Sequence, residues 1–158
     1  MTEIYWQELA HTLFEEAGDA LFLFDPETEQ VQEVNPLAQR LTGFTRRELQ
    51  QYRITFLFRS EAEGGVQRLR HAFRRTGLFH SQEGFWLRHR NEGHWVPVNL
   101  TITRLHTHPR TVGLITARDI TERHQASAAL QKAEAELRRV MSSVSDCLWT
   151  AEIRGQGQ

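Results

Sequence analysis

The alternation of apolar and polar residues predicts five β-strands. Each is a short run rich in β-branched, aromatic or other apolar residues and bounded by residues that favour turns. The runs cover residues 20–24, 30–34, 79–89, 94–105 and 111–118. The first two flank a turn-rich connector and predict a hairpin, and the last three are neighbours along the chain.

Helical spacing of apolar residues predicts helices around these strands. An amphipathic N-terminal helix and three later helices are expected at residues 5–17, 45–51, 54–58 and 61–75. A further helix has Asn35 as its cap, Pro36 at its first position and Gly43 at its end, which are the residues preferred there. The order of elements predicts an α+β fold with one five-stranded antiparallel sheet and helices on one face.

The C-terminal pattern predicts a helix that pairs with another helix. No Pro or Gly interrupts residues 122–144, and small or apolar residues recur there at intervals of four and three. They are Ala126, Leu130, Ala133, Leu137, Val140 and Val144. This spacing is typical of a coiled-coil seam, and its two alanines bury less apolar area than leucines would. A weak seam can hold two registers of similar energy, although the helix could instead fold back on its own sheet.

Composition narrows the class of protein. The 158 residues are 39% hydrophobic and 25% charged, which fits a soluble globular domain, and the net charge of −1 argues against a nucleic-acid binder. The single cysteine, Cys147, excludes an internal disulfide framework and is compatible with a reducing compartment. The chain has no membrane-spanning apolar run and no signal-peptide pattern, so we expect a cytoplasmic location.

Signatures of catalysis and metal binding are weak. The chain has no Gly-rich phosphate loop, no Gly-x-Ser-x-Gly motif and no metalloprotease helix, so no catalytic residue is expected. His106 and His108 have a spacing that could clamp a metal ion, but a turn ended by Pro109 explains them better. His124 is expected on a solvated helix face, as are Arg68, Arg70, Arg74 and Arg75. No metal site is predicted.

Asp119, Ile120 and Thr121, followed by Glu122-Arg123, resemble the Asp-Ile-Thr signature that closes PAS (sensory box) domains before their signalling helix. Three other stretches resemble PAS segments in the right order: the opening strand, the second strand with the first helix, and a later hairpin turn. They are residues 18–25, 33–44 and 90–96. The resemblance covers roughly residues 10–145. It implies the PAS fold and a non-catalytic sensory role in a multidomain bacterial signalling protein, such as a histidine kinase of a two-component system or a cyclic-dinucleotide enzyme.

The resemblance also implies a division into four segments. They are an N-terminal amphipathic helix at 1–17, a PAS sensory domain at 18–121, a signalling linker helix at 122–145, and the start of a truncated second PAS domain at 146–158. The last segment rests on a weak internal repeat, in which residues 140–152 align with residues 13–25. Its alternative is a chance similarity between two amphipathic helix ends.

A transmission mechanism follows from the seam and the resemblance together. A change in the core is expected to shift the last strand, and the junction formed by Asp119, Ile120 and Thr121 would pass that shift to the paired helix. The hydroxyl of Thr121 can cap the first turn of this helix. The expected partner is a second copy of the chain, bound through the terminal helices and the outer face of the sheet.

The sequence leaves open whether the domain binds a haem, a flavin or another small molecule. Haem-binding PAS domains use a histidine on the helix where His71 lies, but helical spacing places His71 opposite the buried stripe. A cysteinyl-flavin sensor needs a cysteine around residues 55–59, where the chain has none. Non-covalent flavin or a small molecule could contact a pocket, whose candidate residues are Asn35, Gln39, Trp86 and Asn99. The alternatives are a haem or flavin sensor of gas or redox state and a ligand-free dimerisation spacer; we expect no cofactor.

For the aromatic residues the simpler interpretation is structural. Trp86 and Trp95 alternate with apolar residues in two of the predicted strands. We therefore expect them to be aromatic residues of the sheet surface, covered by the flanking helices.

Overall fold

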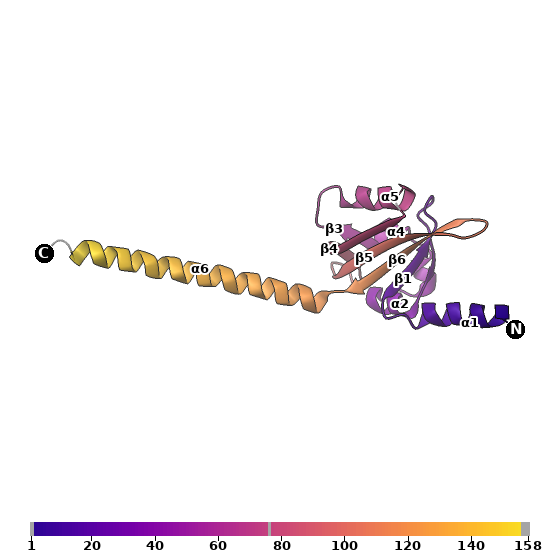
Figure 1. Cartoon of the computed structure of the whole chain (residues 1–158), viewed down its shortest axis with the longest axis horizontal. Helices are drawn as coiled ribbons and strands as arrows, with labels where there is room; N and C mark the ends of the chain where they lie inside the picture. The colour runs from indigo at the N-terminus through magenta and orange to yellow at the C-terminus, as the bar shows by residue number, and fades with distance from the viewer. Residues whose placement is uncertain (1, 76, 156–158) are drawn as a thin grey trace. The chain divides into compact units, whose positions relative to one another are not determined.

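The computed structural model describes residues 2–75 and 77–155, and its central element is one antiparallel β-sheet (Figure 1). Its strands are β1 (Ala20–Phe24), β2 (Val31–Val34), β3 (Phe58–Ser60), β4 (Leu78–Arg88), β5 (Trp95–His106) and β6 (Thr111–Asp119). The spatial order is β2-β1-β6-β5-β4-β3. The first and last strands along the chain are therefore neighbours in the middle of the sheet.

The sheet has six strands, not the five that the sequence predicts. The additional strand, β3, lies where the end of a helix was expected, and its three residues pair with Phe85, Trp86 and Leu87 of β4. A strand of three residues is too short to show an alternating pattern. The α+β class and the antiparallel arrangement agree with the prediction.

Six helices accompany the sheet in the described part of the chain. They are α1 (Thr2–Glu15), α2 (Pro36–Thr42), α3 (Arg46–Leu49), α4 (Ile54–Leu57), α5 (Gly65–Arg75) and α6 (Thr121–Gly155). Helix α2 has the predicted ends, because Asn35 accepts a hydrogen bond from the Ala38 N–H at 3.1 Å and Gly43 has a φ of 73°. Helix α5 begins at Gly65 rather than at residue 61, after a turn.

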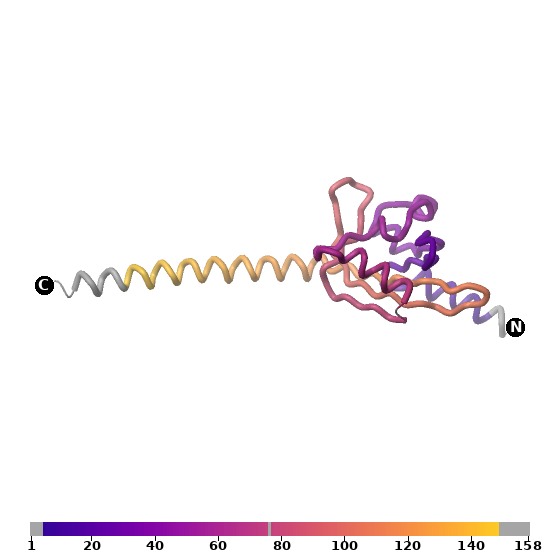
Figure 2. Tube along the Cα trace, turned by 90° about the horizontal axis from the view of Figure 1, so that it is seen from above, coloured from indigo at the N-terminus to yellow at the C-terminus, as the bar shows by residue number. Residues whose placement is uncertain are grey.

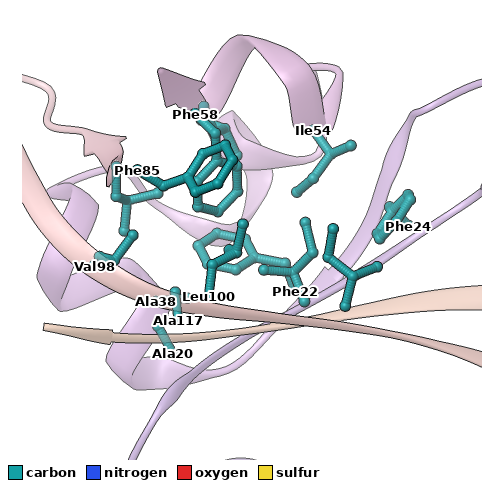
Figure 3. Packing of buried hydrophobic residues seen from close by; sticks show 14 of the residues in the cluster. Ala20, Phe22, Phe24, Ala38, Ile54, Phe58, Phe85, Val98, Leu100 and Ala117 are labelled. Carbon is teal, nitrogen blue, oxygen red and sulfur yellow. The ribbon is translucent and has the colours of Figure 1, made fainter. Parts of the chain in front are cut away.

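Helices α2 to α5 cover one face of the sheet, and a single apolar core lies between the two layers (Figure 3). Alternate residues of the strands point into it, among them Phe22, Leu100 and Ile115, which are all fully buried. The Phe22 and Phe58 rings meet edge to face with their centroids 5.8 Å apart. This core fixes which face of each strand is inside.

Two units are distinguished along the chain, residues 1–121 and residues 122–158. In the second unit, α6 is helical well past residue 145, where the linker helix was expected to end. Residues 146–155 are helical, although the hypothesis of a second PAS domain expected a strand to begin there. Residues 156–158 lie outside the described residues. The assignment of 146–158 to a second domain stays a prediction.

Replacing Phe22 by Ala tests the core. We expect the free energy of unfolding of the 1–121 unit to fall by about 3–5 kcal/mol, because the substitution removes a fully buried ring. Urea denaturation followed by tryptophan fluorescence measures the change. The matched control is Leu78→Ala, since the Leu78 side chain is 62% exposed. Equal losses for the two variants would contradict this assignment of the core.

Candidate functional site

The junction between β6 and α6 contains a single intervening residue, Ile120. The Ile120 N–H donates to the Pro97 carbonyl oxygen at 2.9 Å, so the chain stays bonded to β5 up to the last position before the helix. The Asp119 carboxylate then accepts a hydrogen bond from the Thr121 N–H at 2.8 Å and another from the Thr121 hydroxyl. The end of the strand and the start of the helix are thus held by the same side chain.

Capping of α6 differs from the sequence-based prediction. Thr121 is the first residue of the helix, and the group that accepts its orphan N–H is the Asp119 carboxylate. The Thr121 hydroxyl donates to that carboxylate instead of capping the helix itself. The negative charge of the Asp119 carboxylate also lies near the N-terminus of α6, where the helix macrodipole favours an anion. The three predicted junction residues do lie together.

An ion pair joins the strand just before this junction to the start of the domain. Arg118 donates through Nε and Nη2 to the two carboxylate oxygens of Asp19, at 2.8 and 3.3 Å. Hydrogen bonding and attraction from Asp19 raise the pKa of Arg118, so the guanidinium is charged throughout the accessible pH range. Asp19 immediately precedes β1, so the two ends of the domain meet here.

Asn35, one of the predicted pocket residues, belongs to the same network. Its side chain is fully buried and donates to the Asp19 carbonyl oxygen at 2.9 Å. Its Oδ1 accepts from the Leu21 N–H at 2.9 Å, in addition to the bond that caps α2. Every polar atom of the Asn35 side chain therefore contacts the backbone. In this structure Asn35 ties the start of β1 to α2.

The other three predicted pocket residues do not converge with Asn35. Gln39 is half-buried and accepts a hydrogen bond from the Arg46 N–H at 3.1 Å. Trp86 and Asn99 are half-buried on strands whose adjacent residues, such as Phe85 and Val98, point into the core. Because side chains alternate along a strand, Trp86 and Asn99 lie on the outer face of the sheet. These four residues do not form one pocket.

The outer face carries a series of alternating cations and rings. The Arg59 guanidinium lies 5.5 Å from the centre of the Trp86 ring and 4.6 Å from that of Trp95. Arg88 lies 4.5 Å from the Trp95 ring and 4.0 Å from the ring of Phe56, which belongs to α4 and not to the outer face. The two tryptophans are aromatic residues of the sheet surface, as predicted. Their neighbours are arginines, whereas the sequence-based expectation was cover by helices.

The predicted seam residues lie on one continuous helix. Leu130, Leu137 and Val140 are between 50 and 62% exposed on α6. Because α6 continues past Val144, the four-and-three spacing extends to Cys147, which is also exposed. The sequence analysis did not assign Cys147 to the seam because it ended the helix too early.

Sequence reasoning missed Glu29, whose buried side chain connects the β1–β2 connector to two helices. It is 5% exposed, has a φ of 66°, and lies in the connector between β1 and β2. Its carboxylate accepts from Arg70 Nε and from the Thr55 hydroxyl, both at 2.9 Å. Arg70 therefore holds α5 to the connector and is not only a solvated residue. Nothing in the local sequence distinguishes Glu29 from the exposed acidic residues around it.

The histidines are consistent with their surface assignments. His71 is exposed on α5, as its helical position predicts. His106, the last residue of β5, and His108, in the turn that follows, are also exposed. Among the described residues, no group of three or more His, Cys, Asp or Glu side chains is arranged to hold a metal ion. Within the same residues, no helix has the length and apolar character needed to cross a membrane.

Comparison with known proteins places the chain in a family. The family model for the PAS domain matches residues 18–122, most of the chain, and the chain belongs to the PAS domain family. None of the curated proteins matches it. PAS domains are sensory modules rather than catalytic ones, so this is a sensory domain.

Solved structures of PAS domains share the fold. A PAS domain from a two-component sensor histidine kinase is 18% identical, with a TM-score of 0.60, over 75% of this chain and 99% of that one. A domain of a sensory box sensor histidine kinase/response regulator from Geobacter sulfurreducens is 28% identical, with a TM-score of 0.56, over 73% and 96%. The PAS domain of an HTR-like protein from Haloarcula marismortui is 21% identical, with a TM-score of 0.59, over 75% and 98%.

Replacing Asp119 by Ala tests the capping of α6. We expect amide hydrogen exchange in the first turn of α6 to become about fivefold faster, since a lost cap costs about 1 kcal/mol. Exchange detected by mass spectrometry measures this, with Glu134→Ala as the control that removes an exposed carboxylate from the middle of α6. Unchanged exchange at residues 121–125 in the Asp119 variant would show that the carboxylate does not hold the helix start.

Proposed function

We propose that this chain is a dimeric PAS sensory module that passes changes in its core to α6 through Asp119, Ile120 and Thr121. The observation that carries the proposal is the junction itself. One residue separates β6 from α6, and the Asp119 side chain bonds to the first helical residue. A displacement at the end of β6 has no flexible loop in which it could be absorbed.

Strand β6 is well placed to detect a change in the core. It pairs with β1 on one side and β5 on the other, and its Ile115 and Ala117 side chains are fully buried. A ligand or a repacking event that moves these side chains would move β6. Because packed cores have discrete arrangements, a small change there can select between two positions of the strand.

Exposed apolar surface supports a dimer. Leu21, Leu23 and Leu114 alternate with core residues and are half-buried on the outer face of the sheet, away from α2 to α5. On α1, Tyr5 and Trp6 are 60 and 62% exposed. Together with the seam of α6, these surfaces would be covered by a second copy of the chain. Helix α6 would then form a parallel coiled coil.

The output of the parent protein is proposed from similarity. Two of the structural relatives named above come from sensor histidine kinases. We therefore favour a two-component histidine kinase, with a cyclic-dinucleotide enzyme as the alternative, and a cytoplasmic location.

The chemistry of the core bears on the ligand. The buried cluster is apolar, and the buried polar residues Asn35 and Thr42 hydrogen-bond to the backbone. This favours an apolar ligand or a ligand-free relay over a flavin, which needs polar contacts to its ring. A Soret or flavin absorption band that co-purifies with the protein would favour the cofactor alternative.

A double-mutant cycle tests transmission without a known ligand. Coupling between two sites is reciprocal, so a change in the core on β6 must alter the stability of the α6 dimer if the two are linked. We expect Ile115→Val to change the dimer dissociation constant about threefold, and the change to disappear in an Asp119→Ala background. Sedimentation equilibrium measures the dimer dissociation constants of the four proteins in the cycle.

The control for this cycle is Ile54→Val, the same substitution at a fully buried position on α4. It should change the dissociation constant less than Ile115→Val does. The proposal fails if Ile115→Val has no effect, or if its effect is the same with and without Asp119.

Cys147 offers a native probe of the dimer. In a parallel, in-register coiled coil, its position on the extended seam places it opposite the Cys147 of the second copy. Mild oxidation should therefore give a disulfide-linked dimer in high yield, detected by non-reducing electrophoresis.

The matched variant is Ser142→Cys combined with Cys147→Ser. Residue 142 lies on the opposite side of α6 from the seam, so this variant should cross-link poorly. Equal cross-linking of the two proteins would argue against a parallel seam at these positions.

A further inference from the structure

A hollow at the end of the sheet opposite the β6–α6 junction has the features of a ligand site. It comprises two adjoining depressions of ≈ 380 and ≈ 400 Å³, which share Pro26, Glu27 and Arg104. The walls come from the β1–β2 connector, the C-terminal turn of α5 and the long β5–β6 hairpin, which is orange in Figure 2. The residues around it are far apart in the sequence.

Opposite charges face this hollow without pairing. Asp25 and Glu27 contribute carboxylates from the connector, and Arg74, Arg104 and Arg110 contribute guanidinium groups from α5 and the hairpin. Within residues 2–75 and 77–155, none of these carboxylates forms an ion pair with these arginines. Charges of both signs that line one hollow and do not neutralise each other can attract a ligand that carries both signs.

Arg104 occupies a position where the strand pattern calls for an apolar residue. On β5, Leu100 and Ile102 point into the core, and Arg104 is the next residue on that face. Its Nη1 donates to the Arg74 carbonyl oxygen at the end of α5. Its Nε is buried and has no acceptor in the described structure. A buried N–H donor without an acceptor destabilises the fold, which suggests that this Nε serves a role other than stability.

The residue opposite Arg104 on β6 is a glycine. Gly113 pairs with Arg104 across the β5–β6 ladder. A Cβ atom at this position would lie only 2.3 Å from the Phe24 ring, so glycine is required for Phe24 to pack there. The Phe24 ring therefore fills the space above Gly113, while Arg104 lines both depressions of the hollow.

We propose that this hollow binds a zwitterionic ligand of the α-amino acid class. The ligand carboxylate would contact Arg104 and Arg110, since guanidinium groups bind carboxylates with paired hydrogen bonds. Its ammonium group would contact Asp25 and Glu27. The two acidic side chains argue against a plain anion, because they would repel one. The three arginines argue in the same way against a plain cation.

This proposal is independent of the signalling route through Asp119, because binding can be measured whether or not α6 responds. The probes are L-alanine, propionate and ethylamine, added to the ¹⁵N-labelled chain at matched pH and ionic strength. Propionate lacks the ammonium group of alanine, and ethylamine lacks its carboxylate. The readout is the shift of the arginine Nε–H resonances and of the backbone amides of residues 104 and 111.

We expect a saturable shift with L-alanine, and binding about tenfold weaker for propionate and for ethylamine. Glu27→Gln should weaken alanine binding about fivefold and leave propionate binding unchanged or stronger. Arg110→Gln should weaken both. Both residues are exposed, and no hydrogen bond or ion pair of their side chains is found in the described structure, so the variants should fold.

The matched controls are Glu63→Gln and Arg47→Gln, which make the same charge changes at exposed positions outside the hollow. They should leave the alanine dissociation constant unchanged. The proposal is overturned if alanine causes no saturable shift, if propionate binds as tightly as alanine, or if the controls weaken binding as much as the variants in the hollow.

Discussion

The pairing of β1 with β6 is the constraint on which the rest of this structure depends. Residues Ala20 to Phe24 pair with Ala117 to Gly113, so strands from opposite ends of the domain form the middle of the sheet. The inner side chains of this pair, such as Phe22 and Ile115, lie in the core that α2 to α5 cover. Their separation in sequence makes this contact costly to form, and the buried rings offset that cost.

The same pairing gives the two ends of the sheet different chemistry. At one end, Asp19 meets Arg118, and the following residue, Asp119, fixes the start of α6. At the other end, β1 continues into a connector where, in the described structure, Asp25 and Glu27 form no ion pair with Arg104. One end is closed by ion pairing and hydrogen bonds, and the other is open to solvent. A central strand such as β6 contacts both.

Features that depend on neighbouring residues, such as helix ends, could be predicted from the sequence. Asn35, Pro36 and Gly43 set the ends of α2 because capping depends on neighbouring residues alone. The alternation around Trp86 also held the information that this ring faces away from the core, since its neighbours are both buried. The pocket candidates lie on different faces because the prediction combined residue types without comparing their faces.

Tertiary features were beyond such reasoning. Strand β3 forms by pairing with β4, and the carboxylate of the buried Glu29 is bonded by Thr55 of α4 and Arg70 of α5. The end of α6 was expected at residue 145 because the internal repeat matched the following residues to a second domain, although no Pro or Gly interrupts α6 before Gly155. The Asp-Ile-Thr junction was predicted by family resemblance, and the structure supplied the hydrogen bonds that explain it.

The ion pair between Asp19 and Arg118 has a consequence for how such a domain can be exchanged between proteins. The first and last strands of the domain are held close together, because Arg118 Nε lies 2.8 Å from Asp19 Oδ1. A segment whose ends are adjacent can be inserted into another chain, or removed from it, with little change in the distance that the host must span. Recombination could therefore transfer the domain between proteins as one unit.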